Sequence, residues 1–162
     1  MASLTAIPLW YRLFFLYIEP VATFLGAYYA FFLPQEYIHL THAASAPDEV
    51  QLPLGVEIVL AQLANMYFAF VLNEALVLRA TDDIRVWKTL LFGLLVADFG
   101  HLYSVKPLGA EIYVNVMKWN SIDWGNIAFV YCGAMTRIAF LFGLGFARSP
   151  KGNNAQMDKR MS

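Results

Sequence analysis

Charged residues are scarce in this sequence. Of its 162 residues, 11 are Lys or Arg and 12 are Asp or Glu, so that only 14% are charged, whereas soluble domains have about 25%. The basic residues form no stripe along the chain, which argues against a nucleic-acid partner. In their place, 59% of the residues are hydrophobic and 16% are aromatic. This composition favours a membrane protein, and the length is that of a single domain.

Cysteine and metal-ligand clusters are almost missing as well. Cys132 is the only cysteine, which excludes an internal disulfide, and its apolar surroundings predict an inert packing role. His39 and His42 have the i, i+3 spacing of a helical metal site, but no cysteine and no third histidine lies near them in the sequence. We therefore assign no metal and no cofactor. The N-terminus also lacks the features of a signal peptide, so the first apolar run is expected to be retained.

What the sequence does contain is four apolar runs, each close to the roughly 20 residues that cross a bilayer. They predict an all-α fold, an integral membrane four-helix bundle within residues 13–147. A lead at 1–12 precedes the bundle, and a polar, disordered tail follows it at 148–162. The predicted spans cover about residues 13–33, 55–78, 86–103 and 123–146.

The basic residues predict how this bundle is oriented. Eight of the Lys and Arg residues lie in the lead, in the loop at 79–88 and in the tail, whereas the opposite loops contain only Lys106 and Lys118. Because cytoplasmic loops carry the excess of positive charge, the termini are expected to be cytoplasmic.

Glu19 is the most informative residue of the first span. A carboxylate at this depth costs roughly 2.5–3.5 kcal/mol on insertion scales, so it should face the protein interior and have a partner there. Pro20 follows it and removes a backbone donor, which frees a carbonyl one turn back. Glu19 is therefore a candidate functional residue. The alternative is a kink at which Glu19 only bonds a neighbouring helix.

The second and third spans supply further polar side chains. Tyr67 and Glu74 are seven residues apart and share one helix face, with Asn73 beside them. Asp98 and His101 are three residues apart, and an Asp beside a His orients the imidazole and raises its basicity. They form either an acid–base pair or a structural interhelical bond.

A charged layer is predicted inside the bundle. Counted from the cytoplasmic ends of their spans, Glu19, Asp98 and Arg137 lie about eight, eleven and ten residues deep, at 1.5 Å each. Glu74 is the third acid of the interior. Because one arginine neutralises one carboxylate, another of these acids must be protonated or have a raised pKa.

A membrane cavity with a protonated acid, a carboxylate, a histidine and many aromatic side chains favours an apolar ligand and proton-transfer chemistry. The acid protonates an olefin or epoxide, aromatic faces stabilise the carbocation, and a base removes a proton elsewhere. Double-bond isomerisation and terpenoid cyclisation both follow this scheme. The catalytic candidates are Glu19, Glu74, Asp98 and His101. The substrate-binding candidates are Tyr67, Asn73, Asn126, Tyr131 and Arg137.

Three short motifs carry a family resemblance: Leu-Tyr-Ile-Glu-Pro at 16–20, Leu-Pro-Gln-Glu-Tyr at 33–37 and Ala-Arg-Ser-Pro at 147–150. With the four-helix layout, they make the chain similar to the EXPERA superfamily, which groups the emopamil-binding sterol isomerase with the sigma-two receptor. The resemblance implies a sterol- or lipid-binding cavity in the endoplasmic reticulum membrane, opened laterally between helices. It also implies that Glu19 occupies the position of a catalytic glutamate, whereas Phe15 and Gln62 replace the histidine and the second acid of the isomerase.

The layout also resembles the small membrane-embedded terpene cyclases of fungal meroterpenoid pathways. The leading hypothesis is therefore an acid–base isomerase or terpenoid cyclase of lipid or secondary-metabolite biosynthesis. A non-catalytic lipid or sterol sensor or chaperone is the alternative, and a proton-coupled transporter is disfavoured because the spans show no internal repeat. The expected partners are a hydrophobic small molecule and the lipid bilayer, and a homodimer remains open.

Overall fold

The computed structural model describes residues 7–46 and 51–146, and the predicted tail at 148–162 lies outside them. All secondary-structure elements in the described ranges are helical, with no strand among them. The all-α prediction is therefore confirmed. An apolar run of about 20 residues can satisfy its own backbone hydrogen bonds as a helix, without a partner strand.

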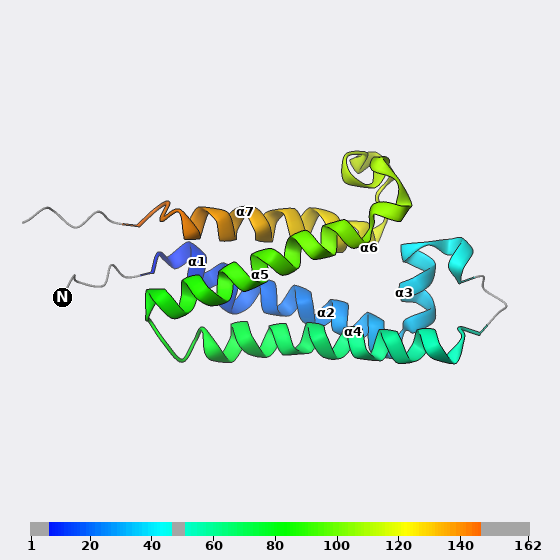
Figure 1. Ribbon diagram of the computed structural model, residues 1–162, viewed down its shortest axis with the longest axis horizontal. Coiled ribbons are helices and arrows are strands. Elements are labelled where there is room, and N and C mark those ends of the chain that lie inside the picture. Colours follow the sequence, from blue (N-terminus) through cyan, green and yellow to red (C-terminus); the bar gives the residue numbers. More distant parts are fainter. Residues whose placement is uncertain (1–6, 47–50, 147–162) are drawn as a thin grey trace, which may run out of the picture.

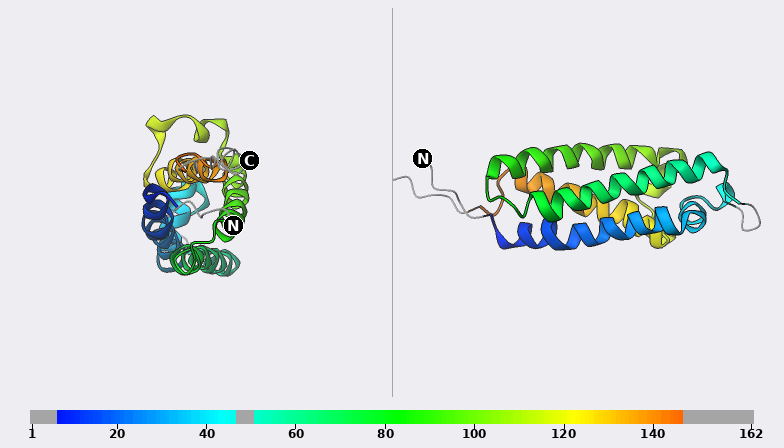
Figure 2. Two further views of the ribbon diagram at one scale, coloured as in Figure 1. Left: turned by 90° about the vertical axis from the view of Figure 1, so that its left-hand side faces the viewer. Right: turned by 90° about the horizontal axis from the view of Figure 1, so that it is seen from below.

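Four long helical segments run along one axis (Figure 1) and surround it when seen end-on (Figure 2). The segments pack in two pairs, with α2 against α4 and α5 against α7. The first segment consists of α1 (Leu9–Leu13), the π-helix η1 (Phe14–Ile18) and α2 (Glu19–Phe32). The second consists of α4 (Leu54–Leu72) and the π-helix η3 (Asn73–Val77). The third is α5 (Ile84–Ser104), and the fourth consists of α6 (Ser121–Asp123), the π-helix η7 (Trp124–Phe129) and α7 (Val130–Leu141).

Two of these segments are long and apolar enough to cross a membrane. They are Leu9–Phe32 and Leu54–Val77, each 24 residues long, with mean hydropathies of 1.3 and 1.6. Only 11% of the most apolar 18-residue stretch of the second segment is buried inside the protein. An apolar helix that exposes most of its surface fits a lipid environment better than water.

The first and last described residues lie at the same end of the molecule (Figure 1). The Tyr11 hydroxyl donates a 2.8 Å hydrogen bond to the carbonyl of Leu144. Arg12 forms a 3.1 Å ion pair with Asp82 in the turn between the second and third segments. The chain therefore passes along the axis an even number of times.

Short helices close the opposite end, where α3 turns away from the bundle axis (Figure 1). The Asn120 side chain caps α6 and donates a 2.7 Å hydrogen bond to the Leu40 carbonyl, which ties the α3 region to the fourth segment. His39 bonds the Ala46 carbonyl and His42 bonds Ser45. No metal-binding group of three ligands occurs in the described ranges. These end elements are α3 (Pro34–Thr41), η2 (Ala43–Ser45), η4 (Lys106–Leu108), η5 (Ala110–Tyr113) and η6 (Val116–Lys118).

The ends of two segments differ from the sequence-based boundaries. The first helix begins at Leu9 rather than 13, so part of the predicted lead is helical. The last helix ends at Leu141 rather than 146, because Gly143 and Gly145 adopt positive φ angles of 74° and 77°. Glycine in this conformation is a common helix terminator.

Pro20 shapes the first segment where Glu19 enters the interior. It has no N–H for the Leu16 carbonyl four residues earlier, and the chain forms the π-helix η1 at this place. The guanidinium of Arg79 donates a 3.1 Å hydrogen bond to the freed Leu16 carbonyl and lies 4.8 Å from the ring centre of Tyr17. The carbonyl is thus satisfied within the protein, as the sequence predicts.

Candidate functional site

A buried cluster of four charged side chains joins the four long segments. Arg137 from α7 lies at its centre, and its Nη1 donates a 2.7 Å hydrogen bond to Oδ2 of Asp98 on α5. Its Nη2 donates to Oε1 of Glu19 on α2, and lies 3.2 Å from Oε1 of Glu74 in η3. The side chain of Arg137 is 4% exposed, and those of Glu19 and Glu74 are 7% and 1% exposed. The structure thus brings together the predicted layer of Glu19, Asp98 and Arg137, and adds Glu74 to it.

The charges of this cluster do not balance when every group is ionised. Three carboxylates face one guanidinium, and Oε2 of both Glu19 and Glu74 is buried without a hydrogen-bond partner. The two glutamates accept from the same Nη2 atom, so their carboxyl groups are neighbours. A proton on one of them reduces the like-charge repulsion and gives the pair an O–H donor. With every group ionised, three carboxylates and one guanidinium would leave the cluster with two excess negative charges.

Gly133 leaves the space in which this cluster forms. A Cβ atom added to it would lie 2.8 Å from Nη1 of Arg137 and 3.2 Å from Oε1 of Glu19. Both atoms are fixed by buried ion pairs, so neither can move away cheaply. The absence of a side chain at this position is what allows the Glu19–Arg137 contact.

Gly133→Ala is accordingly expected to destabilise the protein by about 1–3 kcal/mol, the usual range for overpacking a tight interior. Thermal unfolding in detergent measures the effect. Gly93→Ala is the matched control, since its Cβ would meet no atom within 4 Å, and a helical Gly→Ala change there gains up to about 1 kcal/mol. Equal melting temperatures for Gly133→Ala and the wild type would contradict the packing argument.

The cluster lies in the wall of a cavity of about 490 Å³. This volume is within the range of small-molecule sites, about 300–1,000 Å³. His101 and Asn126 are further polar lining residues. The aromatic lining residues are Tyr29, Tyr37, Tyr67, Phe70, Trp124 and Phe129. The arrangement offers an apolar, aromatic space with acidic groups in one part of its wall.

The predicted pair of Asp98 and His101 is not formed. Oδ2 of Asp98 accepts from Arg137, and no hydrogen bond joins the described Asp98 and His101. Nε2 of His101 is instead buried without a hydrogen-bond partner. A charged guanidinium that donates two parallel hydrogen bonds is a stronger partner for a carboxylate than a neutral imidazole. Asp98 therefore binds Arg137 rather than His101.

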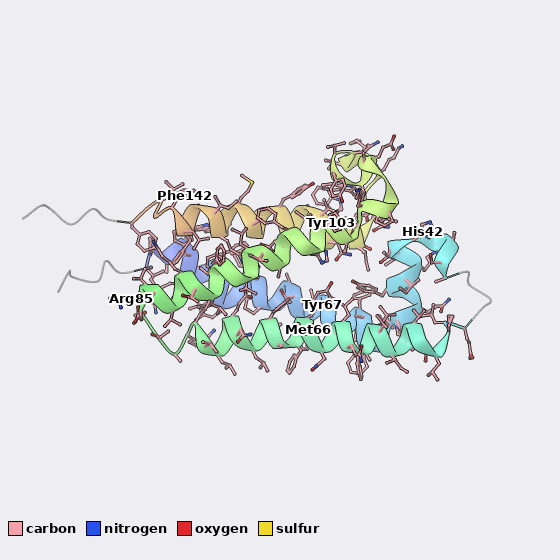
Figure 3. The ribbon with its side chains drawn as sticks, in the orientation of Figure 1. His42, Met66, Tyr67, Arg85, Tyr103 and Phe142 are labelled. Carbon is pink, nitrogen blue, oxygen red and sulfur yellow. The ribbon has the colours of Figure 1, made fainter. Side chains whose placement is uncertain are left out.

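Tyr37 and Tyr67 are neighbours in the wall of the cavity. Their hydroxyl oxygens are 3.3 Å apart, and Tyr67 lies between α4 and the rest of the bundle (Figure 3). Tyr37 comes from α3, in a segment that the sequence-based analysis treats as a loop. Only its place in the Leu-Pro-Gln-Glu-Tyr motif marks it in the sequence.

One family model matches the part of the chain that contains this whole site. The model of the family described as Domain of unknown function (DUF7704) matches residues 4–147. The chain belongs to this family. No curated protein and no solved structure matches it. The domain that defines the family therefore includes all four members of the charged cluster.

The structure places three residues that the sequence singles out away from the cavity or the interior. Tyr131 does not line the cavity, because its hydroxyl donates to the Tyr113 carbonyl at 3.2 Å. Asn73 begins the π-helix η3 and is likewise not among the cavity-lining residues. Cys132 is exposed on the outside of α7 rather than packed in the interior. In each case the helix is predicted correctly, but the sequence pattern does not determine which way the side chain faces.

Proposed function

We propose that this chain is a four-span membrane protein of the endoplasmic reticulum that binds a sterol- or terpenoid-like ligand and moves protons on it. The observation that carries the proposal is the aromatic cavity of about 490 Å³, whose wall contains three carboxyl groups and one arginine. A soluble enzyme has little need to enclose such a cluster between apolar, outward-exposed helices. A membrane enzyme acting on an apolar olefin or epoxide needs both features.

The membrane placement rests on the two apolar segments, to which α5 and the fourth segment are added as further spans. Both have about the length of a bilayer crossing, since α5 contains 21 residues and the fourth segment runs from Ser121 to Leu141. The even number of passes puts both termini on one side. The excess of Lys and Arg at that end supports a cytoplasmic location for them.

The cluster supports a simple acid–base cycle. A protonated carboxyl of the Glu19–Glu74 pair gives its proton to a carbon of an olefin, or to the oxygen of an epoxide, and aromatic faces stabilise the carbocation. Loss of a proton from a neighbouring carbon to a carboxylate, for which Asp98 is the candidate, then forms the new double bond. Arg137 keeps the remaining carboxylate ionised. For an olefin, the proton taken up equals the proton released, so isomerisation or cyclisation needs no co-reactant.

A non-catalytic lipid or sterol sensor or chaperone is the second candidate. It is favoured by the three bonds of Arg137, which connect the four segments and engage one oxygen of each acid. In that case the cluster braces the bundle around a ligand that is held and not converted. Retention of a stoichiometric ligand without chemical change would distinguish this function from catalysis.

The test of ligand binding is purification in mild detergent, followed by mass spectrometry of the small molecules that co-purify. A sterol or a prenylated compound at about one per protein supports the proposal and supplies a substrate to assay. Gly26→Trp is the matched control, because Gly26 lines the cavity and an added Cβ would lie 3.5 Å from Tyr67. The indole ring should occupy part of the cavity, so this variant should lose the compound. Recovery of bulk phospholipid alone from the wild type contradicts the proposal.

The single cysteine tests the membrane placement. Cys132 is exposed on the outside of the fourth segment, and lies about 16 Å along the helix from Ser121, near the middle of a bilayer core of about 30 Å. In permeabilised membranes, we expect a charged maleimide to leave it unlabelled because lipid covers it. Lys118→Cys in a Cys132→Ser background should react readily, since the Lys118 side chain is 68% exposed at the end of the bundle. Equal labelling of the two cysteines would exclude a transmembrane fourth segment.

A further inference from the structure

We propose that the cavity selects an apolar alcohol, and that the hydroxyl group of this ligand donates a hydrogen bond to Nε2 of His101. This inference rests on the proposed function and narrows its ligand class. His101 is thus a binding residue for the ligand's polar end, in place of the base role that its sequence spacing suggests.

The first argument is the state of the imidazole. Nε2 of His101 is buried, has no hydrogen-bond partner, and belongs to a residue that lines the cavity. Nearly all buried polar atoms in native proteins are paired, so an unpaired one in a cavity wall marks a place for a ligand group or for water. In a cavity with many aromatic lining residues, a ligand that forms a hydrogen bond with this atom binds more tightly than one that leaves it unpaired.

The second argument concerns which kind of group fits. In a neutral imidazole one ring nitrogen accepts a hydrogen bond and the other carries the proton. We assign the acceptor to Nε2. An acceptor requires a donor from the ligand. An alcohol supplies an O–H, whereas an ether, a ketone or a plain hydrocarbon does not.

The third argument is the distance along α5. His101 follows Asp98 by three residues, which corresponds to a rise of about 4.5 Å along the helix. A hydroxyl at Nε2 therefore lies about one helical turn from the carboxyl cluster. The reacting double bond or epoxide should accordingly lie close to the hydroxyl end of the ligand, with the rest of the hydrocarbon against the aromatic wall. The ligand class is an unsaturated or epoxidised apolar alcohol.

Two matched pairs of probes test the inference: farnesol with its methyl ether, and cholesterol with its methyl ether. Each ether retains the hydrocarbon and the oxygen but has no O–H donor. Binding is measured by competition with the co-purified compound in detergent. The wild-type protein should bind at least one alcohol about tenfold more tightly than its ether, the gain expected for one buried hydrogen bond.

Two variants of His101 and one control complete the design. His101→Leu removes the acceptor and should bring the alcohol-to-ether ratio close to one without weakening the ether. His101→Gln keeps an acceptor oxygen and should retain part of the preference. His42→Leu is the control, since the His42 side chain is exposed and bonds only Ser45 among the described side-chain contacts, and it should keep the wild-type ratio.

The outcomes separate this inference from the proposed function. If alcohol and ether bind the wild type equally, or if His101→Leu keeps the alcohol preference, the hydroxyl assignment is wrong while an apolar ligand site remains. If neither alcohols nor ethers compete, both the assignment and the sterol- or terpenoid-binding function are overturned. Should His101→Leu fail to fold, the wild-type ratio and the His101→Gln ratio still decide the question.

Discussion

Replacing Arg137 with methionine is expected to lower the free energy of unfolding by about 3–5 kcal/mol, the cost of removing one partner from a buried ion pair. The substitution leaves Glu19, Glu74 and Asp98 without their shared cation. The carboxyl groups can then remain buried only by taking up protons, which costs free energy near neutral pH. Reversible unfolding of the detergent-solubilised protein, followed by circular dichroism, measures the change.

Two further arginine variants calibrate this result. Arg12→Met removes an ion pair whose side chains are 42% and 72% exposed, and such pairs contribute at most about 1 kcal/mol. Arg137→Lys should remain clearly destabilised, because a lysine ammonium is a compact charge that cannot reach the three carboxyl groups with the planar fork of a guanidinium. If Arg137→Met unfolds like the wild type, the cluster does not hold the four segments together.

Glu19→Gln is expected to reduce turnover of the co-purified compound by about 10²–10⁴-fold, the usual contribution of a positioned general acid. The amide has nearly the same shape and can still accept a hydrogen bond from Arg137, so the fold should be retained. What it loses is the exchangeable proton. The measurement is the initial rate of product formation by gas chromatography, with thermal unfolding as the check on folding.

Glu57→Gln is the matched control for this variant. Glu57 lies in the first turn of α4 and is exposed, so its replacement should leave the rate unchanged. Full turnover by Glu19→Gln would remove Glu19 from the role of acid. The same substitution at Glu74, the other member of the carboxyl pair, would then show whether the proton resides there.

The sequence predicts the helices well because length and hydropathy govern them. The four predicted runs coincide with the four long segments to within about five residues at each end, and the largest differences arise at Leu9 and Leu141. Depth counting at 1.5 Å per residue also places Glu19, Asp98 and Arg137 in one layer. These predictions succeed because rise per residue and apolar length do not depend on how the helices pack.

Side-chain partners depend on packing, and the sequence predicts them less well. The spacing of Asp98 and His101 shows correctly that they share a face, but Arg137 from another helix takes the carboxylate. The role of Gly133 follows only from the approach of Glu19 across the interface. The contribution of Tyr37 to the cavity depends on α3, which runs across the bundle axis at one end and contacts α2 and α6 (Figure 1).

Deuterium uptake by the co-purified compound tests the central claim most directly, because proton transfer leaves an isotopic mark even when the overall equilibrium does not change. The purified protein is incubated with this compound in D₂O buffer, and the compound is then extracted and analysed by mass spectrometry. We expect carbon-bound deuterium to appear with the wild type and to be strongly reduced with Glu19→Gln. A compound that is retained by the wild-type protein but gains no deuterium would contradict catalysis and favour a binding protein.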